Sequence, residues 1–205
     1  MCDSISSQEV HERRRKKEEQ IVEETRLTLH KNLKLMYYAN GLMAIGIVLV
    51  IVPVAGLIMM AIGGVMELGG LVRLRNVHHR YMDAVSFSAI GFLIGIIPAG
   101  EGLFAICLGL IGSVMGLLRF RCVIQATNHF LAEEGQEELV TKGNKLWKYQ
   151  IILTVASVVC ELLGAVIFDH MIPILVILLV TLVLSAVTLG IYIDYLEKSS
   201  KVFEQ

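Results

Sequence analysis

Apolar residues in this chain fall into three long runs that are almost free of charge. The runs cover residues 37–72, 84–118 and 149–193. Few charged residues or histidines interrupt them: Glu67, Glu101, Glu161, Asp169 and His170. Uncharged runs of this length are typical of membrane-spanning helices, because a core helix of a soluble protein alternates apolar and polar faces.

The first run is too long to be a single membrane span. As one helix, 37–72 would extend roughly 54 Å, against a hydrocarbon core of about 30 Å. Pro53 lies near its middle, lacks a backbone N–H and disfavours helical geometry at Val52. Gly56 follows shortly afterwards and suits a tight turn. The pattern therefore predicts two helices folded back on each other, with the turn at Pro53.

An internal repeat extends this prediction to the whole chain. The segment around Pro53 reads IGIVLVIVPVAGLIMMAIGGVMELGGLVRLR, and the segment around Pro98 reads IGFLIGIIPAGEGLFAICLGLIGSVMGLLRFR. A weaker copy surrounds Pro173. Repeats of this kind indicate a repeated supersecondary unit. We predict an all-α integral membrane protein of three helical hairpins with turns at these prolines. Its six spans are 36–52, 55–72, 82–97, 102–118, 149–168 and 172–193.

The basic residues indicate how these hairpins are oriented. All 18 Lys and Arg residues lie outside the predicted spans and on one side of them, and the three proline turns contain none. Basic residues mark the cytoplasmic side of a membrane protein. We therefore expect a multi-pass cell-membrane protein with both termini cytoplasmic. Its parts are a charged N-terminal helix (1–35), the transmembrane domain (36–193) with a cytoplasmic loop (119–148), and a C-terminal tail (194–205).

The overall composition agrees with this topology. Hydrophobic residues make up 55% and charged residues 18% of the chain, with a mean hydropathy of +0.67. Soluble domains usually have about 45–50% apolar and about 25% charged residues. The formal net charge of −1 averages over strongly segregated charges, and we expect no nucleic-acid partner.

Two cytoplasmic segments are predicted to be helical. The N-terminal segment lacks Pro and Gly and contains the basic run 13–17 (RRRKK). This run is either a solvated part of the helix or a contact for anionic lipid or a cytoplasmic protein. The loop 119–148 is expected to continue the fourth span and to break near Gly135 or Gly143.

Two intramembrane carboxyl groups are the most informative polar residues. Glu161 lies near the middle of the fifth predicted span, where a carboxylate is costly and usually faces the bundle interior or a water-filled cavity. Ser157 precedes it by one helical turn. Glu67 lies six residues from the cytoplasmic boundary, from which it could reach water. These residues form either a proton- or cation-coupled site or structural bridges between helices.

No catalytic, cofactor or metal site is predicted. The sequence has no phosphate-binding loop, no H-E-x-x-H and no G-x-S-x-G motif. His78 and His79 are adjacent, so their side chains point about 100° apart on a helix and form a poor chelate. His129 is also predicted to lie on the cytoplasmic side. We therefore predict a protein that is not an enzyme.

The repeated hairpins resemble the HdeD-like family of small bacterial membrane proteins. The resemblance covers 41–121 well and 149–193 loosely, and the charged N-terminal segment and the 119–148 loop depart from the family form. It implies an inner-membrane protein linked to acid stress, with no catalytic residues to transfer. The expected function is therefore a non-enzymatic stress-related or accessory role, and the alternative is a small proton- or cation-coupled transporter or channel that uses Glu161.

Overall fold

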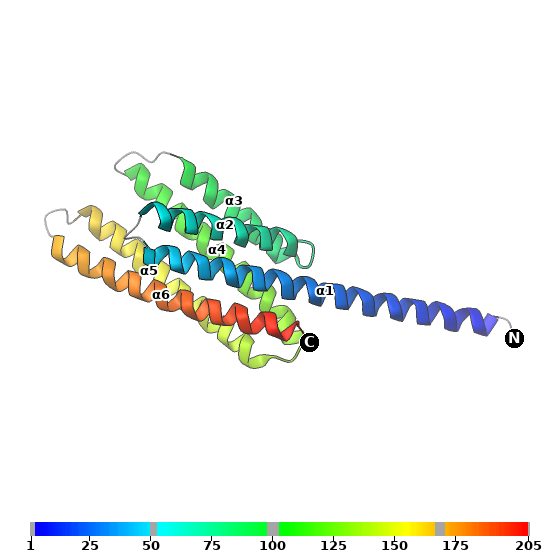
Figure 1. Cartoon of the computed structure of the whole chain (residues 1–205). Coiled ribbons are helices and arrows are strands. Elements are labelled where there is room, and N and C mark those ends of the chain that lie inside the picture. Colours follow the sequence, from blue (N-terminus) through cyan, green and yellow to red (C-terminus); the bar gives the residue numbers. More distant parts are fainter. Residues whose placement is uncertain (1–2, 50–52, 98–102, 167–170, 205) are drawn as a thin grey trace.

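The computed structural model describes residues 3–49, 53–97, 103–166 and 171–204, and its secondary structure there is helical (Figure 1). The prediction of an all-helical chain with six helices is confirmed for these residues. In chain order the helices are α1 (Asp3–Val48), α2 (Pro53–Leu74), α3 (His79–Ile96), α4 (Leu103–Glu133), α5 (Glu137–Val166) and α6 (Met171–Val202).

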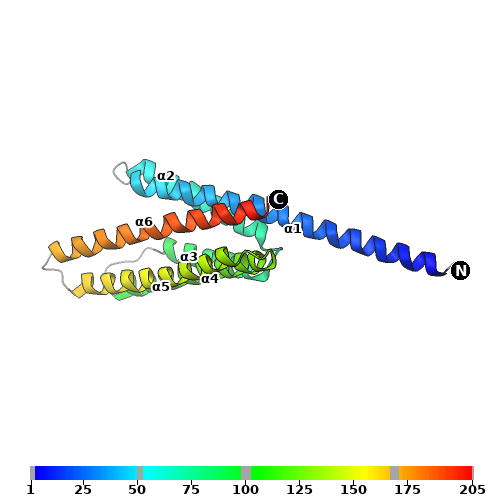
Figure 2. The ribbon, with the colours of Figure 1, turned by 90° about the horizontal axis from the view of Figure 1, so that it is seen from below.

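The helices form a ring in which each one packs against its neighbours in the sequence, and α1 closes the ring against α6. Seen from below, the ring is flattened into two layers, with α1, α2 and α6 in one and α3, α4 and α5 in the other (Figure 2). The α2–α3 and α5–α6 contacts join the layers.

The predicted prolines lie at or near helix starts. Pro53 is the first residue of α2, and Pro173 is the third residue of α6, which begins earlier than the sequence predicted. A first-turn proline costs no hydrogen bond, because the first N–H groups of a helix have no intrahelical partner. Pro98 lies outside the described residues.

The charged N-terminal segment and the first apolar segment form one continuous helix. At 1.5 Å per residue, the 46 residues of α1 span roughly 69 Å. Its N-terminal part projects well beyond the bundle (Figure 1). On this projection Glu12 and Lys16 form an i,i+4 ion pair at 2.8 Å, and Arg15 and Glu19 form another at 3.3 Å.

The break between α4 and α5 is at Gly135, one of the two predicted positions. Gly135 has a φ of +70°, which glycine adopts without steric cost. The Gln136 N–H donates to the Leu131 carbonyl at 2.8 Å, and the Gly135 N–H donates to the Ala132 carbonyl at 3.1 Å. These two bonds form a Schellman motif, which ends α4. The other candidate, Gly143, lies inside α5.

Glycines allow α1 and α2 to approach closely. A Cβ atom at Gly46 would lie 2.9 Å from the Gly56 carbonyl oxygen, and one at Gly56 would lie 2.8 Å from the Gly46 carbonyl oxygen. A Cβ atom at Gly63 would lie 2.7 Å from the Ala39 carbonyl oxygen. Small residues on a helix face permit such approach of two backbones. Gly56, Gly63 and Gly70 recur every seventh residue, so they keep to the side of α2 that faces α1.

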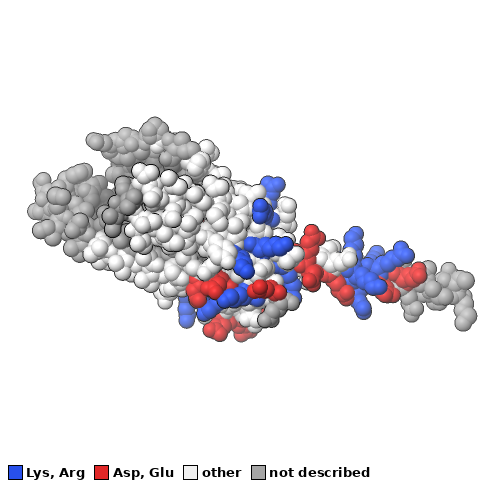
Figure 3. Space-filling model, in the orientation of Figure 1, with Lys and Arg blue, Asp and Glu red and all other residues white. Residues whose placement is uncertain are grey.

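The buried core lies at the charged end of the bundle. Lys, Arg, Asp and Glu gather at that end and along the projecting part of α1, while the other described residues in this view are white (Figure 3). The largest fully buried side chains belong to this end: Leu29, Leu33, Met36, Leu71, Leu74, Tyr81, Val123, Ile124, Leu131, Leu146, Tyr195 and Leu196.

The other half of the bundle exposes large apolar side chains. Val65 is 72% exposed, Phe92 70%, Ile152 64% and Leu179 60%, and these four lie on four different helices. Within the described residues, two segments are long and apolar enough to cross a membrane, Val54–Leu74 and Ile106–Glu133.

Candidate functional site

A buried ion pair joins α2 to α4. The Arg119 side chain donates from a guanidinium nitrogen to Glu67 Oε2 at 3.0 Å. The Glu67 side chain is 4% exposed and the Arg119 side chain 35%. A carboxylate this buried needs a partner, because taking a lone charge out of water costs several kcal/mol or more. Arg119 supplies that partner and retains partial access to solvent.

The pair crosses the interior of the ring. α2 and α4 are not adjacent in the ring, because α3 lies between them in the helix order. Glu67 lies two turns before the end of α2, and Arg119 lies in the middle of α4. The ion pair therefore connects the first predicted hairpin to the second at a level where their backbones are separated.

A large cavity lies between α2, α3 and α4. Its volume is about 590 Å³, and its lining is mostly apolar, with Met60, Phe87 and Met115 among the larger residues. Ser88 and Arg119 contribute polar groups. This cavity could accommodate an apolar group with its polar end toward Arg119.

A second cavity lies on a neighbouring side of α4, between α4, α5 and α6. It is smaller, about 310 Å³, and much more polar. Gly116 and Arg119 line both cavities, so a single arginine contributes to the walls of two neighbouring spaces. The remaining polar lining comes from three helices: Ser113, Gln150, Thr154, Ser157 and Ser185.

The structure brings two of the three predicted polar residues to this region. Glu67 holds Arg119, and Ser157 lines the second cavity beside Arg119. Glu67 is buried and paired, so it does not extend to water as the sequence suggested. Glu161 lies in α5, one turn beyond Ser157, and its side chain is outside the described part of the chain. The predicted Ser157–Glu161 contact therefore stays a prediction.

Sequence reasoning missed Arg119 as the partner of Glu67. The arginine was interpreted only as a basic residue at the end of a span. The available signal was the Arg-apolar-Arg ending shared by the two repeats, Arg73 and Arg75 in one and Arg119 and Arg121 in the other. A buried carboxylate needs a cation at a similar depth in the membrane, and the arginines of these repeat endings are the cations nearest to that depth.

His129 meets the adjacent pair His78 and His79 at the charged end. The ring centroids of His78 and His79 are 4.3 Å apart, and those of His78 and His129 are 5.1 Å apart. His129 Nε2 also lies 3.4 Å from a Glu133 carboxylate oxygen. Burial, followed by the neighbouring His79 and His129, lowers the pKa of His78. Among the described residues, no group of three or more His, Cys, Asp or Glu side chains is arranged to hold a metal ion.

Side-chain contacts fasten α1, α5 and α6 to the charged end of the bundle. Arg26 and Glu134 form a two-pronged ion pair between α1 and the turn that follows α4. The Tyr195 hydroxyl donates to Asn128 Oδ1 at 2.9 Å, and Asn128 Nδ2 donates to Asn144 Oδ1 at 3.2 Å. These bonds satisfy polar groups inside the core and orient the helices that reach the second cavity.

Comparisons with known proteins provide no functional assignment for these features. A scan of the chain against protein-family models gives no match. Comparison with curated proteins gives no match, and comparison with solved structures also gives none. The function must therefore be argued from the arrangement of the residues themselves.

Proposed function

We propose that this chain is a multi-pass integral membrane protein with six spans and with both termini in the cytoplasm. The observation that carries the proposal is the division of the molecule into two halves. One half has a packed core and the charged residues, and the other exposes large apolar side chains (Figure 3). Soluble proteins rarely expose contiguous apolar patches above a few hundred Å², whereas lipid-facing helices expose such side chains as a rule.

All six helices contribute to the exposed apolar surface. Exposed side chains include Val48 on α1, Ile62 on α2, Leu93 on α3, Val114 on α4 and Val159 on α5. On α6 they include Leu179, Val180, Val183 and Val187. The apolar segments of α1 and α5 continue into residues outside the described ranges. The six-span proposal therefore rests on more helices than the two that qualify as candidate spans by length and hydropathy.

Within this class, we favour a non-enzymatic stress-related or accessory role. The resemblance of the repeated hairpins to the HdeD-like family supports it. The Glu67–Arg119 pair supports it as well, because a carboxylate and a guanidinium that neutralise each other act as a bridge between helices. In this proposal the protein acts through its bundle and through cytoplasmic partners of α1.

Digestion with trypsin tests the proposed topology directly. Trypsin cleaves after Lys and Arg, and all 18 of these residues are proposed to lie on the cytoplasmic side. In sealed right-side-out vesicles the chain should stay intact, and in inverted vesicles it should be cleaved, as seen on denaturing gels. A protein on the outer face provides the control for protease activity. Cleavage in sealed right-side-out vesicles, or release of the chain by alkaline carbonate, would contradict the proposal.

One arrangement favours a second candidate, a small proton- or cation-coupled transporter or channel. Arg119 lines two neighbouring cavities beside α4, and the hydroxyl-lined one leads along α5 from Thr154 to Ser157, one turn before Glu161. Such a row of polar groups could pass a proton or a small cation between Glu161 and the Glu67–Arg119 pair.

A flux measurement separates the two candidates. If the protein transports protons or cations, proteoliposomes with a pH gradient should show flux that Glu161→Gln abolishes. The exposed Glu133→Gln variant changes the same chemistry outside the proposed path and should keep the flux. Equal dissipation of the gradient by protein-free liposomes and by proteoliposomes of the folded chain would reject the transporter.

A further inference from the structure

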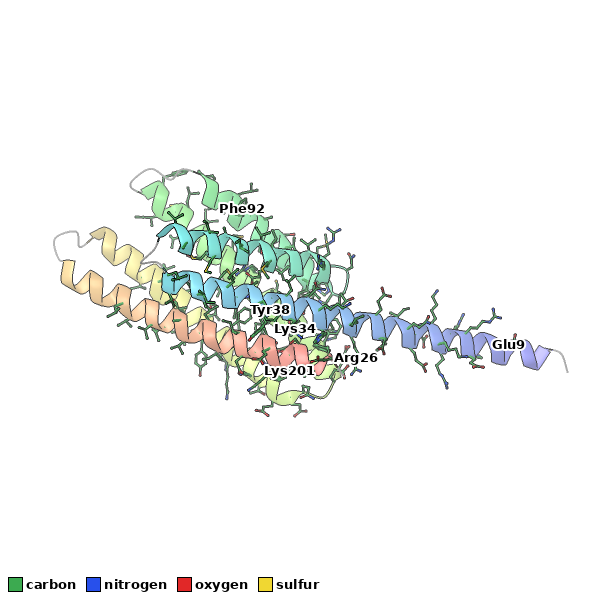
Figure 4. All side chains as sticks on the ribbon, viewed as in Figure 1. Glu9, Arg26, Lys34, Tyr38, Phe92 and Lys201 are labelled. Carbon is green, nitrogen blue, oxygen red and sulfur yellow. The ribbon has the colours of Figure 1, made fainter. Side chains whose placement is uncertain are left out.

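A cleft between α1 and the end of α6 combines basic and apolar groups. Its volume is about 570 Å³. It lies where α1, with Lys34 and Tyr38, runs beside the end of α6 that carries Lys201 (Figure 4). The residues that matter to its chemistry are His30, Lys31, Lys34, Tyr38, Phe203 and Glu204. The geometry points to a binding site for the phosphate headgroup of an anionic phospholipid, an inference that rests on the proposed membrane location.

Two lysines of the cleft are available to a ligand. Over the described residues, neither Lys31 nor Lys34 takes part in an ion pair. The neighbouring Lys201 is already engaged, because its ammonium lies 2.6 Å from Glu197 Oε1. Glu204 is the carboxylate in the lining, so the cleft keeps an excess of positive charge.

The wall of the cleft is held in place by a contact between its two helices. His30 Nδ1 lies 2.8 Å from the Ser200 carbonyl oxygen, which can only accept a hydrogen bond. The Nδ1–H therefore donates to it. This bond fixes the His30 ring between α1 and α6, and Phe203, which is 4% exposed, closes the apolar floor beside it. This wall of the cleft is therefore in place before a ligand arrives.

An exposed apolar stripe continues from the lysines along the same face of α1. Lys31, Lys34, Tyr38, Ile45 and Val48 follow one another at spacings of three, four, seven and three residues, which keep them on one helix face. Tyr38 is 55% exposed, Ile45 51% and Val48 74%. A ligand that follows this stripe is charged at one end and apolar along its length.

The stripe continues from the lysines into the first proposed span, 36–52. From Lys34 to Val48 the helix rises about 21 Å. Tyr38 then lies at headgroup depth, where aromatic side chains with a polar end are enriched. A soluble phosphate would use only the lysines and would leave the apolar stripe without a role.

This position differs from the lipid contact predicted at the basic run 13–17. Because α1 is continuous, Arg15 lies about 28 Å along the helix from Lys34. Charges interact weakly with a surface beyond the Debye length, which is about 8 Å at physiological ionic strength. With α1 along the bundle axis, the run 13–17 is too far from its own bilayer to bind lipid, whereas Lys31 and Lys34 are at its surface.

Lipid binding to the purified full-length chain in detergent tests the inference. Native mass spectrometry would compare phosphatidylglycerol with phosphatidylcholine of the same acyl chains. The unmodified chain should prefer phosphatidylglycerol. Lys31→Gln combined with Lys34→Gln should weaken that binding by about 30-fold, since each lysine near an anionic surface contributes about fivefold to the affinity. The matched control is Lys145→Gln with Lys148→Gln, two exposed lysines of α5 at the same end of the bundle.

Several outcomes would overturn the inference. One is equal binding of both lipids by the unmodified chain, and another is an equal loss of binding in the α5 control. A third is displacement of phosphatidylglycerol by soluble glycerol 3-phosphate, which would show that the site binds a free phosphate. Circular dichroism verifies that all variants are folded. The lipid measurement is made in detergent and is independent of the trypsin experiment. If the chain is protected from trypsin in right-side-out vesicles but shows no preference for phosphatidylglycerol, the lipid site is rejected and the proposed topology stands.

Discussion

Replacing Arg119 with methionine is expected to lower the free energy of unfolding by about 3–5 kcal/mol, the cost of leaving one member of a buried ion pair without its partner. The stranded group is Glu67, whose side chain is 4% exposed. The neighbouring residues of both cavities are largely apolar or hydroxyl-bearing, and none of them supplies a second cation.

Replacing the other member of the pair should lower the free energy of unfolding by less. In Glu67→Gln the arginine loses its anion, but its side chain is 35% exposed and can turn toward water. We expect a loss of about 1.5–3 kcal/mol, the usual contribution of a hydrogen bond to a charged group. The combination of both substitutions should be less destabilised than Arg119→Met alone, because no buried charge is then left unpaired.

Reversible unfolding in detergent micelles, followed by circular dichroism, measures this cycle. Contacting residues that share one interaction typically show coupling energies of about 0.5–3 kcal/mol. Arg121→Met is a suitable control, because Arg121 lies two residues away on α4, is exposed and stacks over Trp147 at 5.5 Å. Strictly additive effects at Glu67 and Arg119, or an equal loss in the Arg121 variant, would show that the pair does not hold α2 to α4.

Local patterns predicted the helices well, because their causes are local. A nearly charge-free run longer than a bilayer, with a proline near its middle, leaves few arrangements other than two helices. Gly135 could be named as a break because a left-handed residue after a long helix favours glycine. The continuity of α1 across the polar and apolar parts also follows from the lack of Pro and Gly in the segment before Met36.

The candidate site was predicted only in part, because its contacts are not local. Periodicity identifies which residues share a helix face but not which helix will face them. Arg119 and Glu67 are 52 positions apart, and His30 and Ser200 are 170 apart. The sequence also could not show that the cleft beside His30 would have two lysines without carboxylate partners, since that depends on where α6 ends. The ion pair and the cleft both depend on how the helices pack in three dimensions, which residue spacing along one helix does not specify.

A second large effect is expected from a lysine placed on the apolar surface of α5. Val159 is 46% exposed and lies about 15 Å along the helix from Tyr149, at the middle of a hydrocarbon core of about 30 Å. A lysine at that depth costs about 2.5–3.5 kcal/mol of insertion free energy. We therefore expect Val159→Lys to lose most of the full-length chain from carbonate-resistant membranes, as measured by immunoblotting of the membrane fraction.

The same substitution at other depths distinguishes lipid from water around this surface. Val22→Lys is the matched control, because Val22 is 58% exposed on the projecting part of α1, outside the proposed membrane. Ile152→Lys, close to the boundary, should have an intermediate effect, since a lysine there can extend its ammonium to the headgroups. In water, all three exposed sites would tolerate lysine to within about 0.5 kcal/mol. A graded loss from Val22 through Ile152 to Val159 therefore requires a hydrocarbon layer around α5, and equal recovery of the three variants would exclude it.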